Sequence, residues 1–139
     1  MGFLIDKKYN RVKIIEKYSI KRSEKKMKVA VIGSRGITKV NLEDYLPEDT
    51  TEIVSGGARG VDTCARKYAS DRGLILTEFL PDYEHFGRGA PLRRNIEIID
   101  YADLVLAFWD GKSRGTKFVI ENCEKRNKEV KIYTLSDNL

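Results

Sequence analysis

Three polar, glycine-rich stretches follow apolar runs that are typical of buried strands. They are GSRGITK (33–39), SGGARGVD (55–62) and DGKSRGT (110–116). Glycines let a backbone come close to a ligand, and free N–H groups at the start of a helix attract anions. The arginines, lysines and hydroxyl groups between the glycines are partners that phosphate geometry can use. One such stretch would be an ordinary turn, but three together favour a phosphate or nucleotide site.

The longest irregular stretch, 81–95 (PDYEHFGRGAPLRRN), adds further candidates. Its aromatic residues could form a lid or flank a base, whereas a lone histidine among acids and aromatics, His85, is more typical of a surface group. Arg94 and Asn95 are better candidates, because the helix they begin faces the same edge as the glycine-rich stretches. Of the neighbouring pair Arg93 and Arg94, we expect one to point to solvent.

These stretches need a scaffold that brings them together, and the rest of the pattern predicts one. Buried strands are expected in KVAVIG, TEIVSGG, LILTEFLP, DLVLAFW and VKIYTL, and helices in KVNLEDYLP, GVDTCARKYASDRG, APLRRNIEIIDYA and GTKFVIENCEKRN. Strands alternating with helices predict an α/β fold with a parallel sheet covered on both faces. In such a sheet every strand-to-helix loop lies at the carboxyl edge.

Helical periodicity also predicts which residues pack. Val61, Ala65 and either Tyr68 or Ala69 share one face of their helix, and Leu92, Ile96 and Ile99 are spaced for packing on another. Both cysteines, Cys64 and Cys123, lie in helical patterns without metal-type spacing, so we expect buried free thiols in a reducing cytoplasm.

The 139 residues suffice for one domain, and no apolar run is long enough to span a membrane. The net charge of +5 is unevenly distributed: residues 1–26 carry nine Lys or Arg and three acids, a net +6. The remainder, 27–139, is close to neutral. We therefore expect a basic N-terminal extension over 1–26 and a domain over 27–139. The extension could bind polyanions or be solvated and loosely ordered, and RVKIIEKYSI within it could form a strand or a helix.

The motifs VIGSRG, IVSGGARGVD, GRGAPLRRN and AFWDGKSRGT, in this order, resemble those of the SLOG superfamily. The resemblance is to its YspA/YpsA-related branch of unknown function, related to the LOG (Lonely Guy) phosphoribohydrolases and to the DNA-processing DprA proteins. It implies a Rossmann-like three-layer sandwich with a mainly parallel sheet of about five strands. It also implies a nucleotide-derived ligand, such as a nucleoside phosphate or an NAD- or ADP-ribose-like molecule, and a homodimer.

Carried over by position, the resemblance implies a ligand site with several walls. Its residues would be Gly33, Ser34, Arg35, Gly56, Gly57, Gly60, Asp62, Arg94, Asn95, Gly115 and Thr116. The chemistry of the loops themselves adds Ser55, Asp110, Lys112 and Ser113 as candidate ligand-binding residues. Asp62 could hydrogen-bond ribose hydroxyls or merely cap its helix. Asp62 and Arg94 are the candidate catalytic residues, and nothing signals a metal or a tightly bound cofactor.

The LOG signature P-G-G-x-G-T-x-x-E is only partly present. Its glutamate position falls on Val119, and Glu121 lies about 200° around the helix from where a replacement is needed. Cleavage of a ribosyl bond builds positive charge on the sugar, which a carboxylate stabilises. Asp62, Asp110 or Glu84 would have to supply it.

Three hypotheses follow from these features. The leading one is a binding domain for a nucleotide-derived ligand, acting as a sensor; the second is a divergent hydrolase of nucleotide N-glycosidic bonds. The third is DprA-like binding of single-stranded DNA, against which the near-neutral 27–139 segment argues, because a groove that tracks a nucleic-acid backbone needs excess positive charge.

Overall fold

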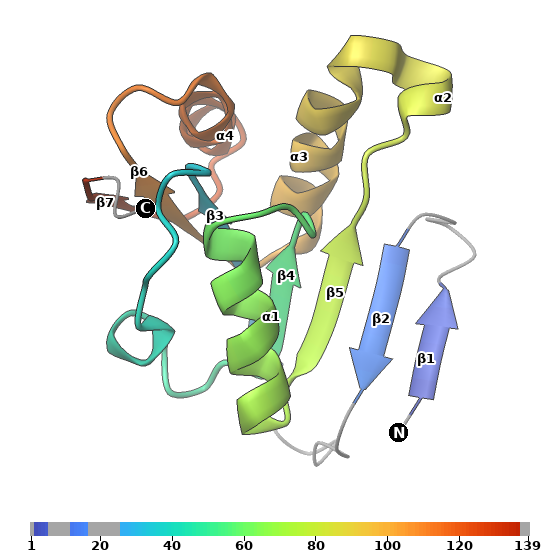
Figure 1. Ribbon diagram of the computed structural model, residues 1–139, viewed down its shortest axis with the longest axis vertical. Coiled ribbons are helices and arrows are strands. Elements are labelled where there is room, and N and C mark those ends of the chain that lie inside the picture. Colours follow the sequence, from blue (N-terminus) through green and yellow to red (C-terminus); the bar gives the residue numbers. More distant parts are fainter. Residues whose placement is uncertain (1, 6–11, 17–25, 137–139) are drawn as a thin grey trace.

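The computed structural model describes residues 2–5, 12–16 and 26–136, which form one sheet with helices on both faces (Figure 1). The strands are β1 (Gly2–Ile5), β2 (Val12–Glu16), β3 (Lys28–Gly33), β4 (Glu52–Ser55), β5 (Ile75–Phe79), β6 (Leu104–Trp109) and β7 (Val130–Thr134). The helices are the 3-10 turns η1 (Leu42–Asp44) and η2 (Gly87–Gly89), and α1 (Val61–Arg72), α2 (Tyr83–Phe86), α3 (Ala90–Tyr101) and α4 (Arg114–Lys125).

The strand order is β1-β2-β5-β4-β3-β6-β7, and the five strands from β5 to β7 are parallel. The predicted α/β fold with about five mainly parallel strands is therefore confirmed. The described parts of the basic extension add two antiparallel strands, because β2 pairs with β5 and β1 pairs with β2. Of the two conformations considered for RVKIIEKYSI, the segment Val12–Glu16 adopts the strand.

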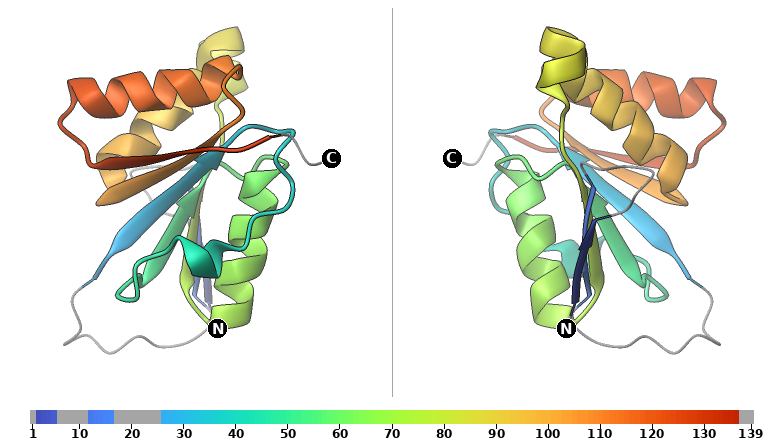
Figure 2. Two further views of the ribbon diagram at one scale, coloured as in Figure 1. Left: turned by 90° about the vertical axis from the view of Figure 1, so that its left-hand side faces the viewer. Right: turned by 90° about the vertical axis from the view of Figure 1, so that its right-hand side faces the viewer.

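Alternate residues of the central strands face opposite layers, which gives the sheet two hydrophobic cores. Val29 and Val31 pack with η1 and α1 on one face, and Ala30 and Ile32 pack with α3 and α4 on the other. Figure 2 shows the same separation, with α1 on one side of the sheet and α3 and α4 on the other. This alternation is what a period of two residues produces in a strand buried on both sides.

Packing within the helices follows the prediction closely, with one exception. Val61, Ala65 and Ala69 are buried along α1, and Ile99 is buried along α3. Leu92, which was expected to pack, is 40% exposed. It lies in the first turn of α3, at the end of the helix that rises past the edge of the sheet.

The prediction of a helix for KVNLEDYLP is wrong, because only the single 3-10 turn η1 forms there. Pro47 has no N–H to donate and favours extended backbone at the residue before it. Tyr45 instead turns inward, with its ring edge-on to Phe108 at 5.0 Å and to Tyr133 at 4.7 Å between centroids. The chain then returns directly to β4.

Among the described helices, none has the length and hydrophobicity needed to span a bilayer.

Candidate functional site

A cleft of about 460 Å³ lies at the carboxyl edge of the sheet, where the loops after β3 and β6 diverge. The β3 loop leads to η1 on one face and the β6 loop leads to α4 on the other. Divergence of neighbouring connections leaves a crevice in which ligands of open α/β sheets bind. The cleft brings together ten of the sequence-predicted site residues: Gly33, Arg35, Gly56, Asp62, Arg94, Asn95, Asp110, Ser113, Gly115 and Thr116.

The other five sequence-predicted residues do not line this cleft. Ser34 and Ser55 are buried and hold the loops: Ser34 Oγ accepts the Asp110 N–H at 3.2 Å, and Ser55 Oγ accepts the Gly57 N–H at 3.3 Å. Gly57 lines a neighbouring cleft, Gly60 is buried at the start of α1, and Lys112 is exposed. Ser34 thus connects the loop after β3 to the loop after β6, whereas Ser55 holds the turn of its own loop.

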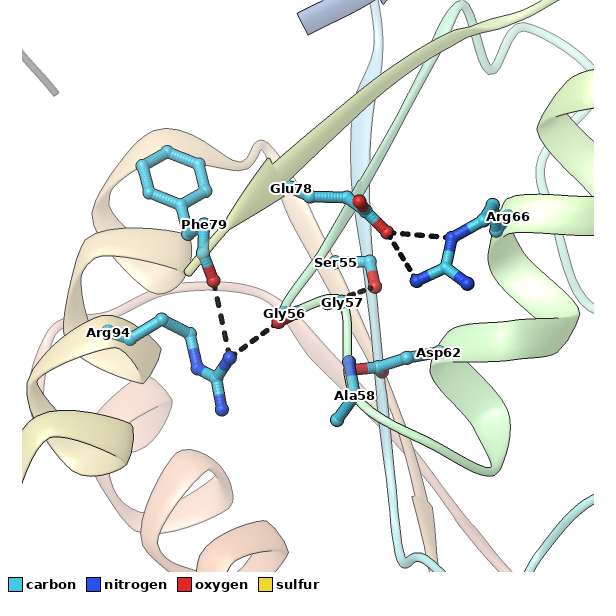
Figure 3. Close-up of polar contacts among 9 residues, drawn as sticks. All are labelled: Ser55, Gly56, Gly57, Ala58, Asp62, Arg66, Glu78, Phe79 and Arg94. Carbon is cyan, nitrogen blue, oxygen red and sulfur yellow. Dashed lines mark hydrogen bonds and ion pairs between the residues drawn. The ribbon is translucent and has the colours of Figure 1, made fainter. Parts of the chain in front are cut away.

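Arg94 is the most constrained cation of the cleft (Figure 3). Its side chain extends from the second turn of α3 and is only 9% exposed. Nη1 donates to the carbonyl oxygens of Gly56 at 2.6 Å and Phe79 at 3.2 Å, and Nε donates to Asn95 Oδ1 at 2.9 Å. Within the part of the chain that the structure describes, Nη2 has no hydrogen-bond partner and remains available to an anion. Arg93 is exposed with its guanidinium over the Phe86 ring, so the pair divides as expected.

The Arg94 guanidinium requires a glycine at position 56. A Cβ on Gly56 would lie 2.5 Å from Arg94 Nη1 and 2.7 Å from its Cζ. The bare backbone lets the carbonyl of β4's loop approach the guanidinium directly. Glycine at this position is therefore explained by a close approach between two elements of the cleft wall.

Asp62 is a buried carboxylate opposite Arg94. It is 7% exposed, and its Oδ2 accepts the Ala58 N–H at 3.0 Å. Burial raises its pKa, an effect partly opposed by the Ala58 N–H and by the charge of Arg94. The structure therefore gives Asp62 a loop-holding role within 55–62, since the N-cap of α1 is Gly60 and has no side-chain cap. A hydrogen bond from the Gly56 N–H lowers the pKa of the carboxylate as well, and Asp62 lines the cleft, where its remaining lone pairs can accept a ligand hydroxyl.

The loop 110–116 is held by its own side chains. Asp110 Oδ1 accepts the N–H groups of Lys112 and Ser113, both at 2.8 Å, and these bonds lower the pKa of Asp110. Ser113 caps α4 by accepting the Thr116 N–H at 3.3 Å. Trp109 Nε1 adds a bond to the Ser113 carbonyl at 3.0 Å, which fixes the entry into the helix.

These bonds leave two backbone donors at the start of α4. Among the described residues, neither the Arg114 N–H nor the Gly115 N–H has an acceptor, and both residues line the cleft. The unsatisfied N–H groups and the dipole of a 12-residue helix favour an anion at this position. Arg94 lines the same cleft, so its positive charge adds to that of these donors.

The structure also ranks the carboxylates considered for chemistry. Val119, at the LOG glutamate position, is fully buried in the core beneath α4, and Glu121 lies on a different groove along that helix. Glu84 is exposed on α2 and does not line the cleft. Asp62 and Asp110 are the acidic residues that line it, and Asp62 is the less exposed of the two.

Some lining residues were not in the predicted set. Arg59 and Arg114, whose charges the sequence had indicated, line the cleft together with Gly36, Ala58, Pro91 and Leu92. An exposed leucine within an otherwise packed helical pattern cannot be recognised from spacing alone. His85 lies outside the cleft, and its Nδ1 is 2.8 Å from Asp82 Oδ2 on the surface of α2. Within the described residues, no three His, Cys, Asp or Glu side chains are grouped as a metal site would require.

Comparison with known proteins gives one partial match. Residues 17–74 match the family model described as DNA recombination-mediator protein A, a family related to the SLOG superfamily. The matched segment contains β3, β4 and α1, and hence the first two glycine-rich stretches, but ends before Arg94 and the 110–116 loop. No curated protein and no solved structure matches the chain.

Proposed function

We propose that the chain binds a nucleotide-derived ligand in this cleft, with a phosphate group between α4 and Arg94 and a ribose near Asp62. The observation that carries the proposal is the pairing of two unsatisfied N–H groups, at Arg114 and Gly115, with a buried guanidinium across the same cleft. Free backbone donors at a helix start recognise phosphate, and the Asp62 carboxylate can accept a sugar hydroxyl.

Isothermal titration of the full chain with AMP, ribose 5-phosphate and adenosine tests this proposal. We expect AMP to bind at least tenfold more tightly than adenosine, and Arg94→Gln to remove most of that difference. Arg93→Gln is the matched control, because Arg93 is exposed and does not line the cleft. Equal affinity for AMP and adenosine, or no binding of either, would overturn the proposal.

A catalytic version of the same site rests on Asp62. Hydrolysis would transfer the ribosyl C1′ from the base to water, with the base leaving protonated, and the carboxylate would stabilise the developing charge on the sugar. Incubation with nucleoside monophosphates and NAD, followed by chromatography for released base, distinguishes a hydrolase from a binding domain. Sustained release that is lost in Asp62→Asn, with AMP still bound, would identify a hydrolase.

Single-stranded DNA is a second candidate ligand, favoured by the match to DNA recombination-mediator protein A. The charge distribution assigns it to a different part of the chain, since residues 1–26 carry a net +6 and the remainder is near neutral. We expect a full chain with Lys21, Arg22, Lys25 and Lys26 changed to Gln to lose affinity for a labelled oligothymidylate while keeping AMP binding. Loss of DNA binding in Arg94→Gln instead would place DNA in the cleft.

Three further expectations complete the proposal. The segment 27–139 carries the ligand site, and the chain forms a homodimer, which sedimentation equilibrium of the full chain would test. Both cysteines are free thiols, which supports a reducing, cytoplasmic location.

A further inference from the structure

A second cleft, of about 430 Å³, adjoins the first at another point where neighbouring connections diverge. The loop after β4 leads to α1 on one face, and the loop after β5 leads to α2 and α3 on the other. The two clefts share a wall made of Arg35, Gly56, Ala58, Arg59, Pro91 and Arg94. They are therefore two compartments of one groove along the carboxyl edge of the sheet.

The two compartments differ in charge. The first contains the carboxylates Asp62 and Asp110 as well as arginines. The second is lined by four arginines, Arg35, Arg59, Arg66 and Arg94, and by no acidic residue. Three of these arginines belong to the shared wall, so positive charge is concentrated at the junction between the compartments.

Arg66 is held in place by Glu78 (Figure 3). Its Nε and Nη2 donate to Glu78 Oε2 at 3.1 and 3.0 Å, and Glu78 is only 5% exposed. The Arg66 side chain itself is 46% exposed, and its Nη1 has no partner in the described part of the chain. A buried carboxylate thus orients a half-exposed guanidinium that still has donors to offer a ligand.

The junction is built by close packing of the first two loops. Gly60 has a φ of +76°, and a Cβ on it would lie 2.8 Å from the Arg35 carbonyl oxygen. A glycine here lets the loop after β4, which carries Arg59, pack against the loop after β3, which carries Arg35. Both arginines therefore line the same wall. Neither side chain has a hydrogen-bond or ion-pair partner among the described residues, so both charges are available.

We infer that the groove takes a dinucleotide whose two nucleosides are joined through a diphosphate, with the second compartment holding the distal nucleoside. The inference rests on the proposed function, which assigns the proximal nucleotide to the first cleft. Three cations at the junction match the two charges of a bridging diphosphate better than the single charge of a phosphodiester. Tyr83, 59% exposed, together with Leu80 and Pro81, gives the second compartment an aromatic and apolar surface for a base.

Titration calorimetry on the full chain with diadenosine diphosphate, AMP and the phosphodiester dinucleotide d(pApA) tests the inference. We expect diadenosine diphosphate to bind at least tenfold more tightly than AMP or d(pApA). Arg66→Gln and Tyr83→Ser should each weaken the binding of diadenosine diphosphate at least fivefold and change the affinity for AMP by less than twofold. Lys67→Gln, a charge loss on the neighbouring α1 position outside both clefts, should change neither.

The possible results separate the two proposals. Two results would overturn the assignment of a nucleoside to the second compartment and leave the proposed function standing. One is that AMP binds as tightly as diadenosine diphosphate, and the other is that neither variant changes the affinity for diadenosine diphosphate. Binding of d(pApA) as tight as diadenosine diphosphate overturns the diphosphate assignment. If no ligand binds, the proposed function fails first. If Arg66→Gln unfolds, the Tyr83→Ser variant decides, because Tyr83 is 59% exposed.

Discussion

The guanidinium of Arg94 lies directly against the backbone of Gly56, with 2.6 Å between Nη1 and the carbonyl oxygen. The contact joins residues 38 positions apart and links the start of α3 to the loop after β4. Because Nη1 also bonds the Phe79 carbonyl, a single side chain closes the ends of β4 and β5 around the cleft. This contact determines what substitutions at Gly56 and Arg94 should do.

Gly56→Ala should damage both the fold and the site. Its Cβ would lie 2.5 Å from Arg94 Nη1, so the buried guanidinium must move out of its bonds. Overpacking of this kind costs about 1–3 kcal/mol of unfolding free energy. We expect a lower midpoint in urea denaturation and at least tenfold weaker AMP binding.

Gly89→Ala is the matched control for that substitution. Gly89 has a φ of −81°, and a Cβ on it would meet no heavy atom within 4 Å. We expect its unfolding free energy to change by about 0.5 kcal/mol or less. An equal loss in both variants would show that the effect at position 56 is not due to Arg94.

Arg94→Lys should show that the shape of the cation matters as well as its charge. Lysine cannot reproduce the planar fork that bonds the Gly56 and Phe79 carbonyls and Asn95 together. A buried carbonyl that loses its charged donor lowers the free energy of unfolding by about 1–3 kcal/mol. Chemical denaturation and AMP titration should both show the loss, whereas Arg93→Lys should leave both within error; an AMP affinity unchanged in Arg94→Lys would contradict the proposed phosphate position.

Asp62→Asn should stabilise the chain while weakening ligand binding, and the stabilisation should depend on pH. Burial raises the pKa of Asp62 above 3.8, so in the unfolded chain this group loses its proton first as the pH rises. The native state therefore loses stability from about pH 4 upward until the pH passes the raised native pKa. Asparagine has no such penalty and can still accept the Ala58 N–H.

Thermal melts from pH 3.5 to 8 measure this effect. The Tm of Asp62→Asn minus that of the parent should grow with pH and then level off. Asp71→Asn, on the exposed side of the same helix, is the control and should give no such trend. A difference that shrinks with increasing pH would show that the Asp62 carboxylate is stabilised in the fold.

Cys123 should resist alkylation in the native protein. Burial raises the pKa of its thiol to about 11, so at pH 8 only about one molecule in 1,000 carries the thiolate. Peptide mass spectrometry after iodoacetamide treatment should show modification of Cys123 at least 100-fold slower than in urea. Cys64, which is partly exposed, should react first; rapid native labelling of Cys123 would mean that α4 opens readily.

Local sequence features were sufficient for the alternation of elements and for most of the cleft. Glycines and hydroxyls after apolar runs identified the loops, because a parallel sheet places all such loops at one edge. They did not distinguish side chains that face a ligand from those that hold the loops. Ser34 and Ser55 have the same composition signal as Ser113, but both are buried and accept hydrogen bonds from the backbone N–H groups of Asp110 and Gly57.

Periodicity of two or 3.6 residues and local backbone preferences were enough to predict the α/β class, the carboxyl-edge loops and the location of the arginines. Tertiary structure alone decided the strand order β1-β2-β5-β4-β3-β6-β7 and the pairing of β2 with β5. It also decided that Arg94 is buried against Gly56 and that Arg66 is held by Glu78 beside a second cleft. These contacts join residues from 12 to 67 positions apart along the chain, and no local pattern specifies which distant partner a strand or a cation meets.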